Sequence, residues 1–367
     1  MGAFHSAWAL VILTVAQAAG PDSQKQASPA LPTYPDHTRL LVIRDASGQE
    51  QPVASPADWA VRRAHIMAHF EQVAGPFPGG ERRVRLDVET VEEHREPRYV
   101  RKKVRFAVEP GDRVPAWLLV PHADPPQLEK RPGMLCLHQT IAIGKDEPAG
   151  LGPNPELAYA RELADHGYVC IVPDYPNFGE YKVDPYAMGY ASATMKGIWN
   201  HLRAVDLLAS LPEVDPGRLG VIGHSLGGHN AIFAALYDPR LRAVVSSCGF
   251  CSFTHYYHGN VLGWSHRGYM PLLKTRYDLD LSRIPFDFPE LIAALAPRAF
   301  FTNSPLHDDN FAVAGVRDAI SAAQTVYDLH HASSRLIALH PDAKHSFPAP
   351  ARRAAYDFLD AQLLKPK

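Results

Sequence analysis

The chain has 367 residues, of which 46% are hydrophobic, 21% charged and 10% aromatic, and this composition is typical of a globular protein with a sizeable core. It excludes a disordered chain and a fibrous repeat. Lysine and arginine number 37 against 39 aspartate and glutamate residues, for a net charge of −2, and no long block of like charge occurs. Nucleic acid is therefore not expected as a partner.

The N-terminus is predicted to be a secretory signal peptide, residues 1–18. The apolar run at 7–16 is too short to span a bilayer, and it ends in the small-x-small pattern Ala16-Gln17-Ala18. Cleavage there would export the protein to the periplasm or the exterior and leave no stable membrane span. The alternative is an uncleaved anchor, since the segment before the apolar run lacks lysine and arginine. Residues 19–35 are polar and proline-rich and are predicted to be a linker.

Residues 36–367 are predicted to form one α/β domain. In its N-terminal extension, 36–121, a helix should begin at Pro56, with Ser55 as its N-cap, and end at Gly75, and antiparallel strands should follow at 84–88 and 100–106. Apolar runs then alternate with helical patterns, with strands expected at 134–137, 169–172, 219–222, 243–246, 299–302 and 336–339. Helices are expected at 155–166, 192–210, 226–237 and 312–328. The alternation predicts a mostly parallel central sheet with helices on both faces and an insertion, 249–297, after the sixth strand and over the active site.

The motif Gly223-His224-Ser225-Leu226-Gly227 lies directly between an expected strand and an expected helix. In that position the glycines permit a sharp turn that projects the Ser225 hydroxyl above the sheet, beside a helix N-terminus. A serine hydroxyl is a weak nucleophile at neutral pH, so it needs a base and an acid that orients the base. The motif therefore predicts a nucleophilic serine and two partners downstream.

Both partners are available in loops that follow later strands. His345 lies far enough beyond the strand at 336–339 for its loop to reach back over the sheet, whereas His340 is nearer the strand end and suits a structural cap. Asp308 and Asp309 follow the strand at 299–302, and either could orient His345. The oxyanion is expected to be held by the backbone N–H of Leu226 and by that of Thr140 or Gln139, in the loop after 134–137.

The sequence resembles the α/β-hydrolase superfamily, and more narrowly the exported bacterial esterases related to acetyl xylan esterase and dienelactone hydrolase. The stretches that carry the resemblance are the Ser225 motif, His138-Gln139-Thr140, 167–174, 294–298 and the loops around the acid and the base. In similar proteins an apolar residue follows the acid by three positions, as Phe311 follows Asp308, so the resemblance favours Asp308 as the acid. Gln139 replaces the usual glycine of the oxyanion loop.

Substrate contacts are expected from loops at the carboxyl edge of the sheet, because ligands of α/β proteins bind there. Aromatic rings beside polar groups suit a sugar ring or an aryl ester, and the candidates are Tyr175, Phe178, Glu180, Tyr181, Tyr256, Tyr257 and Trp264. His255 and His258 with His266 lack a further acid or cysteine that would complete a metal site. No metal or other cofactor is expected.

The four cysteines, Cys136, Cys170, Cys248 and Cys251, lie in or next to apolar runs and are predicted to be buried thiols, with one disulfide left open. The predicted function is a secreted serine carboxylic ester hydrolase that acts through an acyl-enzyme on a small-molecule or polysaccharide ester. A carbohydrate ester is the substrate class implied by the resemblance and by export. The alternatives are a serine peptidase of the prolyl-oligopeptidase type and a non-catalytic binding protein on a hydrolase scaffold.

Overall fold

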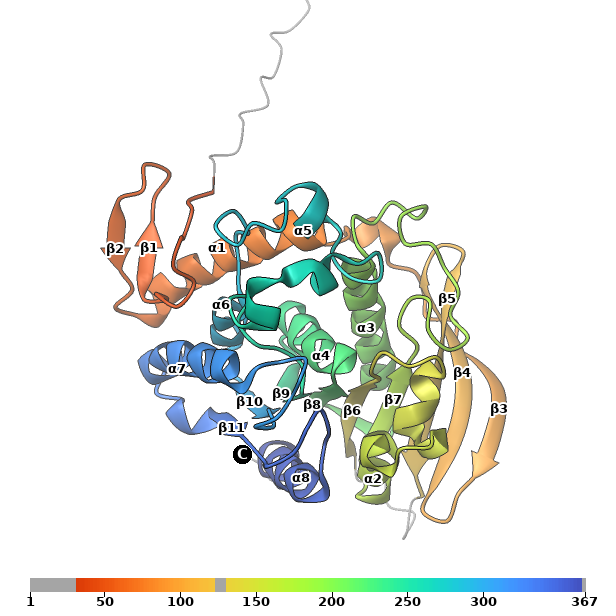
Figure 1. Cartoon of the computed structure of the whole chain (residues 1–367). Coiled ribbons are helices and arrows are strands. Elements are labelled where there is room, and N and C mark those ends of the chain that lie inside the picture. The colour runs from red at the N-terminus through yellow and green to blue at the C-terminus, as the bar shows by residue number, and fades with distance from the viewer. Residues whose placement is uncertain (1–30, 123–129, 365–367) are drawn as a thin grey trace, which may run out of the picture. The chain divides into compact units, whose positions relative to one another are not determined.

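A nine-stranded sheet forms the centre of the computed structural model, which describes residues 31–122 and 130–364 (Figure 1). The predicted signal peptide lies outside the described residues. In spatial order the sheet is β11-β10-β9-β8-β6-β7-β5-β4-β3. Its strands are β3 (Glu89–Arg95), β4 (Tyr99–Glu109), β5 (Asp112–Pro121), β6 (Arg131–Leu137), β7 (Val169–Pro173), β8 (Val214–His224), β9 (Leu241–Ser247), β10 (Ala299–Asn303) and β11 (Leu336–Leu339).

The strands from β11 to β7 pair in parallel, whereas β5, β4 and β3 are joined by antiparallel pairing. Because parallel strands run the same way, their carboxyl ends lie along one edge of the sheet, and the loops that leave them meet there. The predicted mostly parallel sheet is confirmed. The insertion follows β9, the seventh strand of this sheet, whereas it was predicted to follow the sixth strand. The count differs because β5, which is joined to β4 at Gly111, was not predicted as a separate strand.

Helices cover both faces of the sheet (Figure 1). Side chains alternate along β6, so that Met134 and Cys136 pack toward α2 (Tyr159–Asp165) and α8 (Ala349–Leu363), while Leu135 and Leu137 face the opposite layer. That layer contains α1 (Pro56–Ala74), α3 (Ala193–Ser210), α4 (Leu226–Tyr237), α6 (Phe288–Ala293) and α7 (Val313–Leu329). The two apolar clusters hold the sheet between them.

The first part of the N-terminal extension, up to Gly75, belongs to this second layer. A short hairpin of β1 (Val42–Arg44) and β2 (Glu50–Pro52) precedes α1, which starts with a Ser55–Asp58 capping box and ends at Gly75 with φ 96°. The predicted linker is too long at its C-terminal end. The Tyr34 ring is buried, and its hydroxyl bonds to the Nδ1 of His65 at 2.8 Å, so Tyr34 belongs to the folded domain and not to a linker.

The predicted strand at 84–88 is wrong. Asp87 has φ 40°, which breaks the extended backbone, and pairing with β4 begins only at Glu89. One hydrogen bond, from the N–H of Ala107 to the carbonyl of Leu86 at 2.6 Å, ties this segment to β4. Alternation in the sequence therefore marked a segment with one side against the core, but not a ladder of hydrogen bonds.

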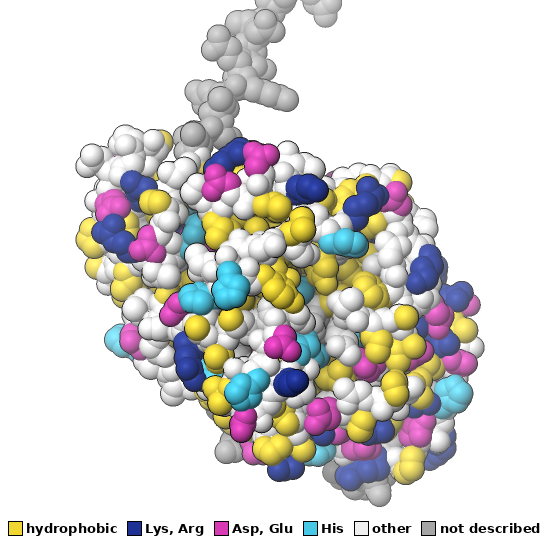
Figure 2. Space-filling model, viewed as in Figure 1, with side chains coloured by type: hydrophobic (Ala, Val, Ile, Leu, Met, Phe, Trp, Pro, Cys, Tyr) yellow, Lys and Arg dark blue, Asp and Glu magenta, His cyan; other side chains and the backbone are white. Residues whose placement is uncertain are grey.

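The insertion contains two 3₁₀ turns, Tyr256–Gly259 and Val261–Ser265, followed by α5 (Leu272–Thr275) and α6. All four cysteines are buried free thiols, so no disulfide joins them. Within residues 31–122 and 130–364, no helix is long and apolar enough to cross a membrane. On the face in Figure 2, side chains of both charge signs are interspersed, as the near-neutral composition leads one to expect.

Candidate active site

Ser225 occupies the sharp turn between β8 and α4, with φ 53° and ψ −116°. This conformation is sparsely populated for residues other than glycine and is typical of functional turns. Its neighbours are glycines because the turn is crowded: a Cβ on Gly223 would lie 2.2 Å from the carbonyl oxygen of Gly227, and a Cβ on Gly227 would lie 1.9 Å from that of Leu137. The turn thus sets Ser225 at the carboxyl edge of the sheet and brings α4 close to the end of β6.

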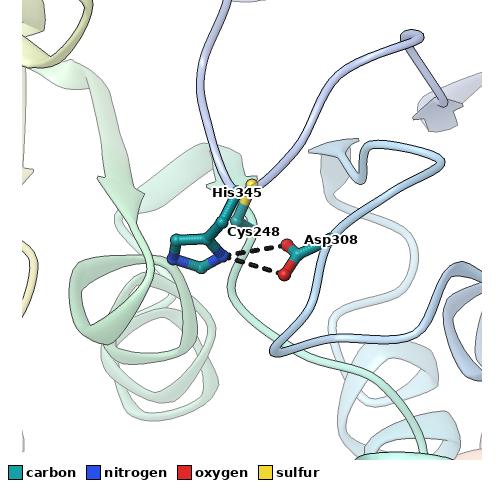
Figure 3. Close-up of side chains that lie close together, drawn as sticks. All are labelled: Cys248, Asp308 and His345. Atoms are coloured by element: carbon teal, nitrogen blue, oxygen red, sulfur yellow. Dashed lines mark hydrogen bonds and ion pairs between the residues drawn. The ribbon is translucent and has the colours of Figure 1, made fainter.

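Asp308 and His345 meet above the same edge, from the loops after β10 and β11 (Figure 3). The Nδ1 of His345 lies 3.0 Å from each carboxylate oxygen of Asp308. Burial raises the pKa of Asp308, but the hydrogen bonds from His345 and from the backbone N–H groups of Phe311 and Asn310 outweigh it and hold that pKa below its usual value. An ionised Asp308 fixes the proton on Nδ1 and leaves Nε2 of His345 as a base. Asp309 is exposed, and within the described residues no hydrogen bond or ion pair joins it to His345.

Ser225 and His345 border one cavity of about 320 Å³, called the catalytic cavity below. Its other walls are Gln139, Thr140, His229, Tyr256, Gly263, Trp264, Tyr269, Asn310 and Phe311. Within the described residues no hydrogen bond joins the Ser225 hydroxyl to His345. Such contacts are often long in unliganded enzymes and tighten when substrate binds.

Two backbone N–H groups beside Ser225 are free to bind an oxyanion. Leu226 is the first residue of α4, so its N–H has no partner within the helix, and Thr140 N–H has no acceptor in the described parts of the chain. The Nδ1 of His138 donates to the Gln139 carbonyl at 2.6 Å, while its Nε2 accepts from the Tyr175 N–H at 3.0 Å. Because carbonyl and N–H of a trans peptide point in opposite directions, this bond turns the Thr140 N–H away from His138.

The predicted substrate-contact residues fall into three groups. Tyr256 and Trp264 border the catalytic cavity. Phe178 borders a second cavity of about 320 Å³, which shares Thr140 and Tyr269 with the first. The remaining four line neither cavity and act in the surrounding structure.

The four predicted residues that line neither cavity are held by polar partners elsewhere in the structure. Tyr175 and Tyr181 are buried, with their hydroxyls bonded to the Gly268 carbonyl and to Asp112. Glu180 forms ion pairs at 3.0 Å with Lys145 and Lys103. Tyr257 is half exposed and donates to the Oδ1 of Asn310 at 2.6 Å, so it braces a wall of the catalytic cavity from outside.

The cavity walls that were not predicted from the sequence are His229, Gly263, Tyr269, Asn310 and Phe311, of which Phe311 was noted only for its spacing from Asp308. His229 could have been found, because it lies one helical turn after Ser225 and so projects from the same side of α4. Tyr269 and Gly263 belong to the insertion, whose irregular path carries no periodic pattern. Tyr269 shares a hydrogen bond of 3.1 Å with the Thr140 hydroxyl and so connects the insertion to the oxyanion loop.

Among the described residues, Cys248, Asp308 and His345 offer three potential metal ligand atoms within 4.8 Å of one another (Figure 3). Burial and the charge of Asp308 raise the pKa of the Cys248 thiol, so it stays protonated and is a poor ligand. His255 bonds instead to the Ser252 hydroxyl at 2.9 Å, and His266 accepts from the Gly268 N–H at 3.0 Å. These histidines do not converge with His258 into such a group.

Comparison with known proteins shows the family to which the chain belongs. The model of the prolyl oligopeptidase family matches residues 157–363, which is more than half of the chain. The quorum-quenching protein AidA of Acinetobacter baumannii is 33% identical over 104 residues, 28% of this chain and 33% of its own length. The chain thus spans only about a third of that relative.

Solved structures match over a longer stretch. A glucuronoyl esterase from Solibacter usitatus aligns with a TM-score of 0.68 and 20% identity, over 90% of this chain and 99% of the other. A glucuronoyl esterase of carbohydrate esterase family 15 from Caldicellulosiruptor kristjansonii aligns with a TM-score of 0.65 and 17% identity, over 94% of both chains. At these identities the likeness shows the fold, and it confirms the α/β-hydrolase fold expected from the sequence. With a family match that includes Ser225, Asp308 and His345, the chain belongs to the prolyl oligopeptidase family and is a serine hydrolase.

Proposed function

We propose that this protein is a carboxylic ester hydrolase that acts through an acyl-enzyme on an ester of a carbohydrate. The observation that carries the proposal is the catalytic cavity itself. Ser225 and the Asp308-bound His345 border it together, and the unpaired N–H groups of Leu226 and Thr140 lie beside Ser225. Nucleophile, base and oxyanion donors are the groups that acyl transfer needs.

The proposed reaction runs in two halves. The Ser225 Oγ attacks the ester carbonyl while the Nε2 of His345 takes its proton, and Asp308 holds the imidazolium in place. The Leu226 and Thr140 N–H groups bind the oxyanion, and the alcohol leaves with the proton from His345. A water molecule, deprotonated by His345, then attacks the acyl-serine, and the acid is released with Ser225 restored.

An ester is favoured over a peptide by what precedes the catalytic part of the chain. Peptidases of the prolyl-oligopeptidase type usually carry a large β-propeller. Here residues 36–121 form the β1–β2 hairpin, α1 and the three antiparallel strands of the main sheet, which leaves no four-stranded blade in this part of the chain. The glucuronoyl esterase of Solibacter usitatus, whose name gives a carbohydrate ester, matches over 90% of this chain, and that supports the choice of substrate class.

The experiment compares hydrolysis of p-nitrophenyl acetate by the wild type with that by Ser225→Ala, Asp308→Asn and Asp309→Asn. Loss of the nucleophile should lower kcat by at least about 10³, and Asp308→Asn should lower it by about 10²–10⁴, because the amide no longer fixes the His345 tautomer. Asp309→Asn is the matched control: it makes the same change one residue away, on an exposed side chain, and should stay within about twofold.

Two further measurements separate the alternatives. Faster turnover of peptide anilides than of aryl acetates would favour a peptidase. If a serine-directed phosphonate fails to label Ser225, the protein is a binding protein on a hydrolase scaffold. Export is proposed from residues 1–18 alone, and fractionation of cells that express the full chain tests it.

A further inference from the structure

Two side chains in the wall of the catalytic cavity are buried with a polar atom unpaired. His229 and Trp264 are each only 3% exposed, and within the described residues neither the Nε2 of His229 nor the Nε1 of Trp264 has a hydrogen-bond partner. A buried polar atom without a partner is costly, so a pair of them at one site requires an explanation. Both residues border the cavity that contains Ser225.

The contacts of His229 fix which of its nitrogens accepts. Its Nδ1 lies 3.2 Å from the carbonyl oxygen of Gly249, an acceptor, so this nitrogen carries the proton. Burial lowers the pKa of His229 to about 3, which keeps the ring neutral. The Nε2 is therefore a lone-pair acceptor, held on α4 one turn beyond the nucleophile.

Trp264 supplies the complementary group. It lies in the 3₁₀ turn Val261–Ser265 of the insertion, and its ring packs edge-on against His229 with 4.7 Å between the centroids. An indole Nε1–H can only donate. Two adjacent rings in the wall of the catalytic cavity, from different parts of the chain, thus carry an unpaired donor and an unpaired acceptor within the described residues.

Other buried ring nitrogens lack partners too, but they do not share this setting. Trp59 Nε1 and His69 Nδ1 both lie on α1, in the N-terminal extension, and neither residue borders the catalytic cavity. His229 and Trp264 alone among these four lie at the site where a substrate must bind.

A donor beside an acceptor selects one kind of substrate group. An amide N–H would satisfy only His229, and a carbonyl would satisfy only Trp264, whereas a hydroxyl can donate to the first and accept from the second. The rings of Tyr256, Tyr269 and Phe311 lie 5.8–6.2 Å from that of Trp264, and such a wall suits the apolar face of a sugar ring.

We propose that His229 and Trp264 form a specificity site that binds one free hydroxyl of a carbohydrate ester next to the scissile bond. The inference rests on the proposed ester hydrolase function and adds the group by which the substrate is recognised. Binding of the hydroxyl satisfies both buried nitrogens at once, so an ester without that hydroxyl leaves both unpaired and is discriminated against.

The wild-type enzyme alone gives the first test. Its kcat/KM is measured on a monoacetylated methyl pyranoside and on the monodeoxy analogues in which each free hydroxyl in turn is replaced by hydrogen. One deoxy analogue should lose about tenfold to a hundredfold in kcat/KM, because two hydrogen bonds to buried groups are lost, and the others should lose much less. Equal kcat/KM across the series would overturn the proposal.

Variants then assign the effect to the two rings. Trp264→Phe and His229→Phe keep an aromatic ring but remove the polar atoms, and each should reduce the ratio of kcat/KM between the parent sugar and the sensitive deoxy analogue toward one. Trp59→Phe and His69→Phe remove the same unpaired nitrogens outside the cavity and should keep the wild-type ratio. A ratio that persists in the Trp264 and His229 variants would mean that water fills the site, and would overturn the proposal.

Failure of this inference and failure of the proposed function give different results. Protein that hydrolyses p-nitrophenyl acetate through Ser225 but no acetylated sugar would contradict the hydroxyl site and leave the ester hydrolase intact. Protein that hydrolyses neither would contradict the proposed function.

Discussion

At the scale of single residues, the position of the oxyanion loop depends on how closely the backbone of α4 approaches the end of β6. The turn at Ser225 brings α4 so near β6 that a Cβ on Gly227 would lie 1.9 Å from the Leu137 oxygen and 2.9 Å from that of His138. These are the residues that lead into Gln139 and Thr140, so the spacing of the two oxyanion donors is set by a glycine and not by the side chains of the loop.

Gly227→Ala should therefore impair catalysis much more than a change in the Thr140 side chain. The alanine methyl must push the end of β6 away, which displaces the Thr140 N–H, and loss of one oxyanion donor lowers kcat by about 10²–10³. Thr140→Val removes only the hydroxyl bonded to Tyr269 and should cost less than about tenfold. Steady-state kinetics on p-nitrophenyl acetate measures both, with circular dichroism to check folding. Similar losses in the two variants would contradict this prediction.

Residues of the site were predictable where chain order and chemistry restrict the choice. The Ser225 motif stood between a strand and a helix, and acid and base had to follow later strands, which pointed to His345 and to one of Asp308 and Asp309. The structure distinguishes the two aspartates through burial and the contact with His345. Tyr269 was not predictable, because its place depends on how the insertion folds back over the sheet.

At the scale of elements, the insertion is fastened to the core by a helix cap. Asp287 caps α6, where its Oδ1 accepts from the Phe288 N–H at 2.6 Å, and its carboxylate also accepts from the Phe253 N–H at 2.9 and 3.0 Å. One buried carboxylate thus joins the two ends of the insertion. Trp264 lies between those ends along the chain, so the cap supports the wall of the catalytic cavity.

Asp287→Ala should destabilise the protein by about 2–4 kcal/mol, because it removes a helix cap and leaves two buried N–H groups without an acceptor. Asp287→Asn keeps one acceptor oxygen in nearly the same shape and should cost clearly less. Equilibrium unfolding in urea gives both free energies. A loss below about 0.5 kcal/mol for the alanine variant would show that the cap does not fasten the insertion.

Elements were predictable where apolar runs and helical periods are unambiguous. The strand expected at 336–339 and the helix expected at 226–237 have the bounds of β11 and α4. The strand at 84–88 failed because alternation reports which side chains face the core, whereas a strand also needs a partner in register, and Asp87 turns the chain before pairing starts.

At the scale of the whole molecule, the N-terminal extension is held to the catalytic part by a buried charge cluster. Glu290 on α6 binds Arg62 on α1, and it accepts from the Nδ1 of His37 at 2.9 Å. Burial lowers the pKa of His37, but the charge of Glu290 and the hydrogen bond to it outweigh burial, with a further contribution from Asp287, and raise that pKa above its usual value.

This arrangement predicts a loss of stability as the pH rises above the usual histidine pKa of about 6.5. A histidine whose pKa is higher in the folded state stabilises the fold fully below its unfolded pKa of about 6.5, and the stabilisation disappears as the pH rises through the folded pKa. The difference in Tm between wild type and His37→Gln should therefore shrink from pH 6 to pH 9, as thermal unfolding would show. A constant difference over that range would contradict the prediction.

The two outer strands of the nine-stranded sheet also have a consequence for how the protein behaves at high concentration. An outer strand leaves one row of backbone groups open, and such a row can recruit a strand from another molecule. At one side β11 has only four residues, and at the other β3 carries Glu89, Glu92 and Glu93 together with Arg95. Charged side chains of both signs cover that flank in Figure 2. Shortness at one end and charge at the other make both margins poor templates for intermolecular β-sheet.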